Sequence, residues 1–119
     1  MFDLARSVLA IRQPTLRATV EHLQREAMRL TLSTEAICTI VDWSTNASWT
    51  MRGRNEPAVH DLVTEVASTG QRKVVGSAVL APAGRGAVLA VRRLSPYSVT
   101  EIATLEAFAR GVAPVLDDF

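Results

Sequence analysis

Several features that would narrow the function are scarce in this sequence. It has one cysteine, Cys38, so it can form neither an internal disulfide nor a thiolate metal site of its own. His22 and His60 have no second ligand at a metal-binding spacing, so we expect no metal and no cofactor. No apolar run reaches the roughly 18 residues of a membrane span, and residues 1–10 carry an acid and an arginine. We therefore expect a cytoplasmic protein, from a bacterium, without a membrane segment.

The sequence also has little net charge and no recognisable set of catalytic residues. The chain has 13 basic and 12 acidic side chains, a formal charge of +1, which gives no field that would attract nucleic acid or an anionic membrane. A serine or cysteine nucleophile needs a base held beside it by a third group. Cys38 instead lies in apolar company, and burial raises a thiol's pKa, so we expect inert packing and no enzyme.

What the sequence does contain is enough apolar material for one core. Its 119 residues, 48% of them hydrophobic, predict a single domain over 1–119. Residues 1–13 are predicted to form an N-terminal helical extension, because apolar residues recur there at helical spacing until Pro14 interrupts: Leu4, Val8 and Ile11. A second helix is predicted over 14–31. Its apolar stripe consists of Leu16, Val20, Leu23, Ala27 and Leu30, and its other positions are expected to face solvent.

Alternating and β-branched runs predict the strands. Residues 36–43 and 48–52 are expected to form a hairpin, and three shorter strands are predicted over 73–75, 78–81 and 87–91. A helix over 57–69 separates the two groups, with Gly70 placed to end it.

The last helix has the clearest start signal in the chain. Ser98 and Glu101 have the spacing of a capping box, and Tyr97 and Ile102 have that of a hydrophobic staple. Pro114 is expected to kink or end this helix.

This order of elements resembles the GAF family of sensory and regulatory domains. The resemblance covers nearly the whole chain and is carried by three stretches: residues 62–71, similar to the family's helix and its turn; residues 77–82, similar to its Ser-hydrophobic-Pro strand; and residues 86–91, similar to its Gly-hydrophobic strand. It implies an α+β fold of the profilin or PAS kind. In that fold an antiparallel sheet of five or six strands carries the N- and C-terminal helices on one face and one helix on the other.

One departure from the family bears on function. Members that enclose a small ligand usually have a longer segment between the strand at Val74-Val75 and the strand at Ser77, whereas Gly76 stands alone here. The family's cyclic-nucleotide motif is also missing. The resemblance therefore implies a compact, non-catalytic regulatory domain in signal transduction, acting through dimerisation and contact with other signalling proteins. The alternative is a small-molecule sensor with a reduced pocket.

Two sets of candidate residues follow from these hypotheses. An aromatic and basic set near one end of the hairpin is expected either to line a ligand slot or to belong to the core: Trp43, Trp49, Met51 and Arg52. The apolar seams at Leu16 to Leu30 and at Leu105 to Val115 are expected to cover the sheet, or the terminal helices are expected to pair between two copies in a homodimer. The residues expected at that dimer contact are Leu4, Val8, Ile11, Leu16, Val20 and Leu23.

Overall fold

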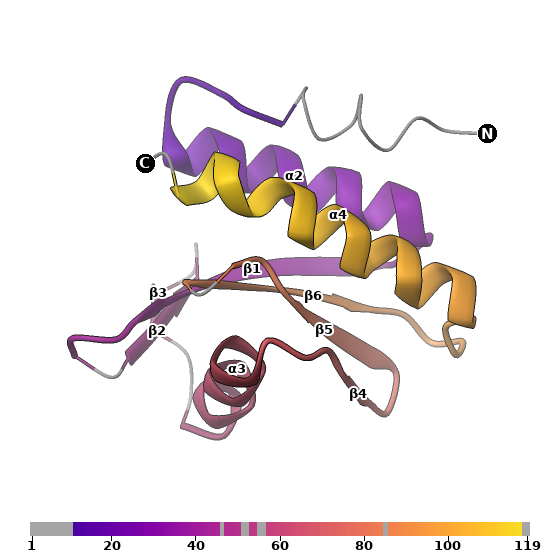
Figure 1. The fold of residues 1–119 in the computed structure, drawn as a ribbon. Helices are drawn as coiled ribbons and strands as arrows, with labels where there is room; N and C mark the ends of the chain where they lie inside the picture. The colour runs from indigo at the N-terminus through magenta and orange to yellow at the C-terminus, as the bar shows by residue number, and fades with distance from the viewer. Residues whose placement is uncertain (1–10, 46, 51–52, 55–56, 85, 118–119) are drawn as a thin grey trace.

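One antiparallel sheet, covered by helices on both faces, organises the fold (Figure 1). The computed structural model describes residues 11–45, 47–50, 53–54, 57–84 and 86–117, with the backbone alone at 47–49, 53–54 and 57–58. The helices are α2 (Leu16–Thr31), α3 (Pro57–Thr69) and α4 (Val99–Asp117). The strands are β1 (Glu35–Asp42), β2 (Ala47–Thr50), β3 (Gly53–Arg54), β4 (Lys73–Val75), β5 (Ala78–Pro82) and β6 (Ala87–Arg92).

The strand order in the sheet is β3-β2-β1-β6-β5-β4, with every neighbouring pair antiparallel. Strands β2, β1, β6 and β5 have four to eight residues and form the body of the sheet. The edge strands β3 and β4 have only two and three residues. The sheet therefore has four strands when only its body is counted and six with its short edges, against the five or six expected.

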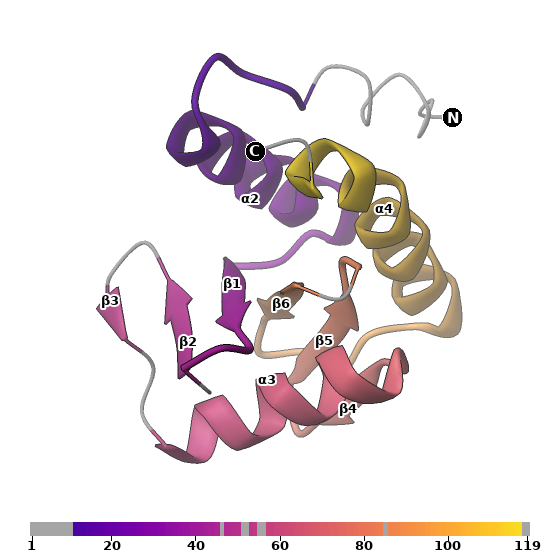
Figure 2. The same ribbon diagram turned by 60° about the vertical axis from the view of Figure 1, so that its left-hand side comes forward.

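The distribution of helices over the two faces confirms the expected fold class. Helices α2 and α4 lie side by side on one face, and α3 lies alone on the other, as the views in Figures 1 and 2 agree. Among the described helices, none is both long enough and apolar enough to cross a membrane.

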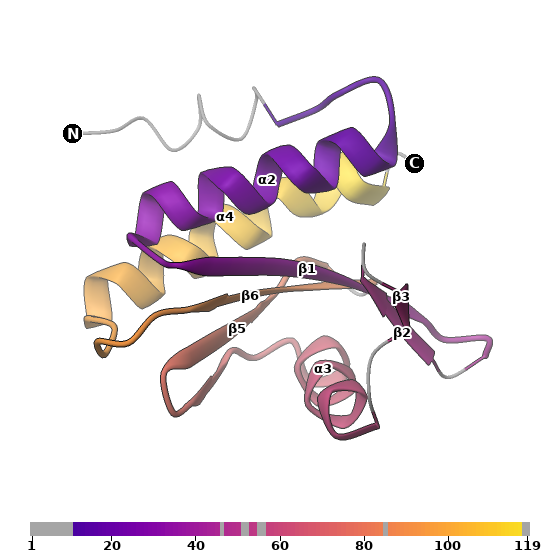
Figure 3. The same ribbon diagram turned by 180° about the vertical axis from the view of Figure 1, so that it is seen from behind.

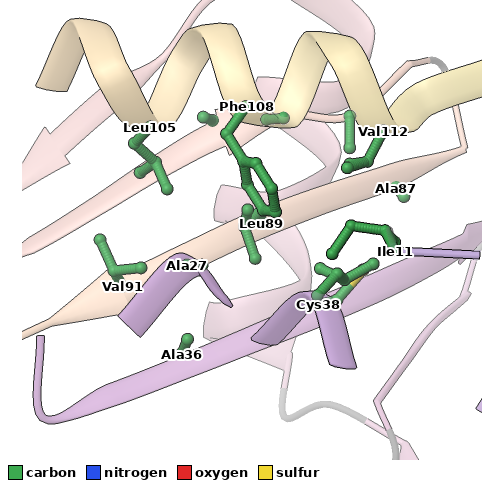
Figure 4. Packing of buried hydrophobic residues seen from close by; sticks show 14 of the residues in the cluster. Ile11, Ala27, Ala36, Cys38, Ala87, Leu89, Val91, Leu105, Phe108 and Val112 are labelled. Carbon is green, nitrogen blue, oxygen red and sulfur yellow. The ribbon is translucent and has the colours of Figure 1, made fainter. Parts of the chain in front are cut away.

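The larger core fills the space between the α2 and α4 layer and the sheet. Phe108 is fully buried and points from α4 toward the strand that carries Leu89, with Val112 beside it on the same helix (Figure 4). Cys38 and Ile11 close the other side of this cluster. The seam predicted for the second helix thus does cover the sheet, because Val20 and Leu23 are buried in the same core.

The N-terminal segment differs from its expectation where it is described. Residues 11–13 form no helix, and the side chain of Ile11 is fully buried rather than lying beyond the core. Thr15 explains where α2 begins, because it is extended and its hydroxyl accepts the Ala18 N–H at 3.1 Å. The predicted start at residue 14 is therefore two residues early, and Leu4 and Val8 lie outside the described residues.

The capping box of the last helix is confirmed. The Ser98 hydroxyl accepts the Glu101 N–H at 3.1 Å, and the Glu101 carboxylate accepts the Ser98 N–H at 2.9 Å. The expectation that Pro114 could end this helix is wrong, because α4 continues to Asp117. Leu116, in the turn after the proline, is buried in the core, and this burial offsets the backbone hydrogen bond that proline cannot donate.

Candidate functional site

The residues predicted to line a ligand slot are only partly described. Trp43 follows the end of β1, and 47% of its surface is exposed. Trp49 lies in β2, paired in register with Ile40, and its side chain is outside the described part of the structure. Met51 and Arg52 are outside it altogether. A ligand slot formed by these four residues remains a prediction, with the one described side chain at the surface.

The face of the sheet under α3 is filled by packed apolar side chains. Val63 and Val66 of α3 are buried in one cluster with Val41, Leu80 and Val88, which come from three different strands. Close packing of branched side chains leaves little room for a ligand between this helix and these strands. The connection from β4 to β5 is short as predicted, because Gly76 turns the chain at a φ of 59°.

An open groove of about 340 Å³ runs beside the end of α3. Its walls include Ala67 and Gly70 from α3 and its end, Pro82 from β5, and Glu106 and Arg110 from α4. It exists because β4 pairs with β5 only up to Leu80, so the last residues of β5 form an edge of the sheet. A more polar hollow of about 350 Å³ adjoins it, where Arg72 and Glu106 form an ion pair at 2.6 Å. None of these residues was predicted from the sequence to line a ligand site, since three separate segments meet here.

A second groove, of about 260 Å³, lies between the first half of α2 and strands β1 and β2. Leu16, Ile40 and Cys38 contribute to its lining. Burial raises the pKa of the Cys38 thiol to about 12, so the sulfur remains protonated and unreactive at neutral pH. This confirms the expected packing role of Cys38.

The histidines and acids form no metal site in the described part of the chain. His60 lies within 3.4 Å of the Thr64 hydroxyl, one turn along the same helix. No three histidine, cysteine, aspartate or glutamate residues among those described lie close enough to hold a metal ion.

A polar cluster around Arg93, which sequence reasoning missed, fixes one end of the molecule. The Arg93 guanidinium donates to both oxygens of Glu101, at 2.5 and 2.6 Å, and to the backbone carbonyls of Thr31, Ser95 and Pro96. Its carbon lies 4.2 Å from the centre of the Tyr97 ring.

The Glu101 carboxylate is held in its ionised form by this cluster. Its hydrogen bonds from Arg93, and then from the Ser98 N–H, lower its pKa to about 2. The Arg93 donors have fixed partners within the chain, so this cluster is a structural clamp rather than a site for substrate. The clamp joins the end of α2 to the start of α4.

Of the residues predicted for a dimer contact, some are buried in the core and one is exposed. Ile11, Val20 and Leu23 are buried in the core of the single chain, so they cannot meet a partner while this fold is intact. Leu16 keeps 38% of its surface exposed. The outward positions of α2 are instead mostly charged, with Arg17 paired to Glu21 at 3.7 Å.

Comparison with known proteins identifies the type of fold. No family model matches the sequence, and the search of curated proteins found no match. Among solved structures, the crystal structure of the GAF domain from Acinetobacter phosphoenolpyruvate-protein phosphotransferase is similar over 97% of this chain and 90% of that chain. The two have a TM-score of 0.73 and 15% sequence identity.

The layered α+β architecture is therefore that of a known class of domain. More particularly, the chain has the fold of a GAF domain, as the order of its elements had predicted. At 15% identity this likeness establishes the fold alone.

Proposed function

We propose that the chain is a non-catalytic regulatory domain in signal transduction, which acts in the cytoplasm through dimerisation and contact with other signalling proteins. The observation that carries this proposal is the close packing of the second half of α3 on the sheet, as far as the described residues show it. Val63 and Val66 pack against the body of the sheet where a ligand-enclosing domain would need a cavity. Apolar packing at this contact favours a domain that acts through its surface.

The chemistry of the described residues supports the same proposal. The thiol of Cys38 is buried and protonated, and the charged groups with the strongest contacts, Arg93 and Glu101, are engaged with each other and with the backbone. A catalytic acid or base needs a pKa near the working pH and access to substrate. The Glu101 carboxyl, with a pKa of about 2, lacks the first of these properties.

The fold gives the proposal its context. The similar solved domain is part of a phosphoenolpyruvate-protein phosphotransferase, so this fold occurs there within an enzyme. As a regulatory domain, the present chain would pass its signal to another domain or protein.

A second candidate, a small-molecule sensor with a reduced pocket, is favoured by one observation. The groove beside the end of α3 measures about 340 Å³, within the range of small-ligand pockets. Glu106 and Arg110 contribute to its lining, and Arg72 lies in the polar hollow that adjoins it. Its ligand would be small and would remain partly exposed to solvent.

Native mass spectrometry of the protein purified from cells tests the two candidates against each other. A regulatory domain that acts by contact should give the mass of the chain, or a multiple of it, without added small molecules. An added mass that is lost on denaturation would contradict this proposal and favour the sensor. A groove-filling variant, Ala113→Leu, would then locate the ligand, because Ala113 lines the groove from α4.

A further inference from the structure

The groove beside the end of α3 and the polar hollow that adjoins it form one continuous depression. They measure about 340 and 350 Å³, and Gly70 and Glu106 line both of them. Helices α3 and α4 lie on opposite faces of the sheet (Figure 3), yet both contribute to the groove, as does Pro82 of β5. The groove therefore crosses the edge of the sheet, beyond the point where β4 pairs with β5.

This edge of the sheet is unsuited to a further strand. Strand β4 pairs with β5 only as far as Leu80, so Pro82 lies at an open edge. Proline has no N–H to donate to a neighbouring strand, and this disfavours extension of the sheet by a segment of another protein. Small side chains leave the room in the groove: Ala67, Ser68, Gly70, Gly84 and Ala113. The groove is thus better suited to a small molecule than to an added strand.

Arg110 brings an unpaired positive charge to the groove. Glu106 lies one turn before it on α4, the spacing and order that favour an ion pair along a helix. Glu106 is instead paired with Arg72, at 2.6 Å, in the polar hollow. Arg110 has no ion pair or hydrogen bond with other residues in the described part of the chain. Its guanidinium is therefore free to bind a ligand, and a carboxylate matches it in both shape and charge.

Other groups around the groove limit the ligand to one negative charge. Helix α3 ends at the groove, before Gly70, without a basic residue in its last turn, and the last carbonyls of a helix carry a partial negative charge. Glu106 adds a carboxylate to the lining, and Asp117 lies near Gly84 at one end of the groove. These groups repel a dianion, so the charges favour a single carboxylate at Arg110.

We infer that the groove binds a small organic anion with one carboxylate and a compact apolar body. Arg110 holds the carboxylate, and the apolar body lies against Ala67, Pro82 and Ala113. The inference rests on the second candidate function, the small-molecule sensor, and names the class of its ligand. A probe that makes only these contacts in an open groove binds weakly, with a Kd on the order of 1 mM.

Amide NMR spectra of the whole chain, titrated with sodium benzoate at constant ionic strength, test this inference. Benzoate carries one carboxylate on a compact apolar ring, and benzamide has the same ring without the charge. Benzoate should give saturable shifts at Gly70, Arg110 and Ala113 with a Kd on the order of 1 mM, and benzamide should bind roughly tenfold more weakly. Phthalate, which adds a second carboxylate to the ring, should also bind more weakly than benzoate.

Replacing the arginine separates the charged contact from the apolar one. Arg110→Gln should weaken benzoate binding roughly tenfold and leave benzamide binding unchanged. Arg110 is exposed, so the circular dichroism and the unfolding midpoint of this variant should be those of the wild type. Arg25→Gln is the matched control and should bind benzoate like the wild type. Arg25 is an exposed arginine of α2 that likewise has no ion pair with other described residues.

Three results would overturn the inference. Absence of saturable shifts at these residues up to about 20 mM benzoate would exclude the site. Equal affinity for benzoate and benzamide, or an Arg110→Gln variant that binds benzoate like the wild type, would exclude the carboxylate contact. Phthalate that binds as tightly as benzoate would exclude the limit of one negative charge.

Failure of this inference is distinguishable from failure of the candidate functions. Dimerisation and contact with partner proteins do not enter the titration. A protein that retains an added mass from cells but does not bind benzoate would still be a small-molecule sensor, with a ligand of another class.

Discussion

Replacing Gln24 with methionine tests which group accepts the hydrogen bond from the backbone N–H of Cys38, in the part of β1 that precedes its pairing with β2. Strand β2 pairs with β1 from Ile40 onward, so on that side the Cys38 N–H has no partner among the paired residues of β2. The Gln24 side chain of α2 supplies one, accepting this N–H at 2.8 Å. Cys38 is 1% exposed, so water cannot replace the lost oxygen.

The magnitude follows from leaving one buried donor unpaired. Methionine is similar in length to glutamine but is a weak acceptor, so Gln24→Met should cost about 1–3 kcal/mol. For a chain of this size, 1 kcal/mol corresponds to about 4 °C in Tm, so the expected decrease is about 4 to 12 °C. Gln24→Glu keeps an acceptor oxygen at this position and should lose clearly less.

Thermal unfolding followed by circular dichroism measures the stability, and amide hydrogen exchange at Cys38 reports the hydrogen bond itself. Gln24→Met should unfold earlier and exchange faster at this amide. The reasoning is refuted if the methionine variant has the wild-type Tm and protection. It is also refuted if the glutamate and methionine variants lose the same amount, because packing rather than the acceptor would then explain the loss.

Three further predictions concern the last helix and the thiol. Ser98→Ala removes the acceptor for the Glu101 N–H and should cost about 1 kcal/mol in denaturant melts, whereas an unchanged midpoint would mean that the cap contributes nothing. The pKa of Glu101 is about 2, below its ordinary value of 4.5. The stability that this group contributes is therefore present above pH 4.5 and lost as the pH falls from there toward 2. Glu101→Gln should flatten that decline between these pH values, and a variant with the wild-type pH profile would contradict the assignment. Cys38 should react slowly with a thiol reagent in the native state, because its pKa is raised to about 12, and rapid labelling would reopen a redox role.

Local signals in the sequence predicted the elements that depend on neighbouring residues. Helix α3 has the predicted bounds, Pro57–Thr69, because its proline, its apolar spacing and Gly70 all act within a few residues. The capping box at Ser98 was predictable for the same reason. The two faces of β1 were also predictable, since Cys38 and Val41 belong to the separate clusters on opposite sides of the sheet.

The contacts that the sequence did not predict follow no local pattern of residue spacing. Gln24 was interpreted as a solvent-facing residue of α2, and its acceptor role becomes visible only when the register of β1 and β2 is known. No sequence motif indicated the role of Arg93, because its hydrogen-bond partners are three backbone carbonyls and one carboxylate in other turns of the chain. Ile11 was assigned to a dimer seam, but the fold turns it inward.

The central claim is that this domain acts through its surface and not through a ligand held beneath α3. A dilution series of two-dimensional amide NMR spectra, from about 500 µM to about 10 µM, tests it residue by residue. The amide signals of exposed residues at the proposed dimer contact should move with concentration, while those of Val63 and Val88 beneath α3 should stay in place. Signals that move beneath α3, or a spectrum in which no exposed residue's signal changes with concentration, would contradict the account.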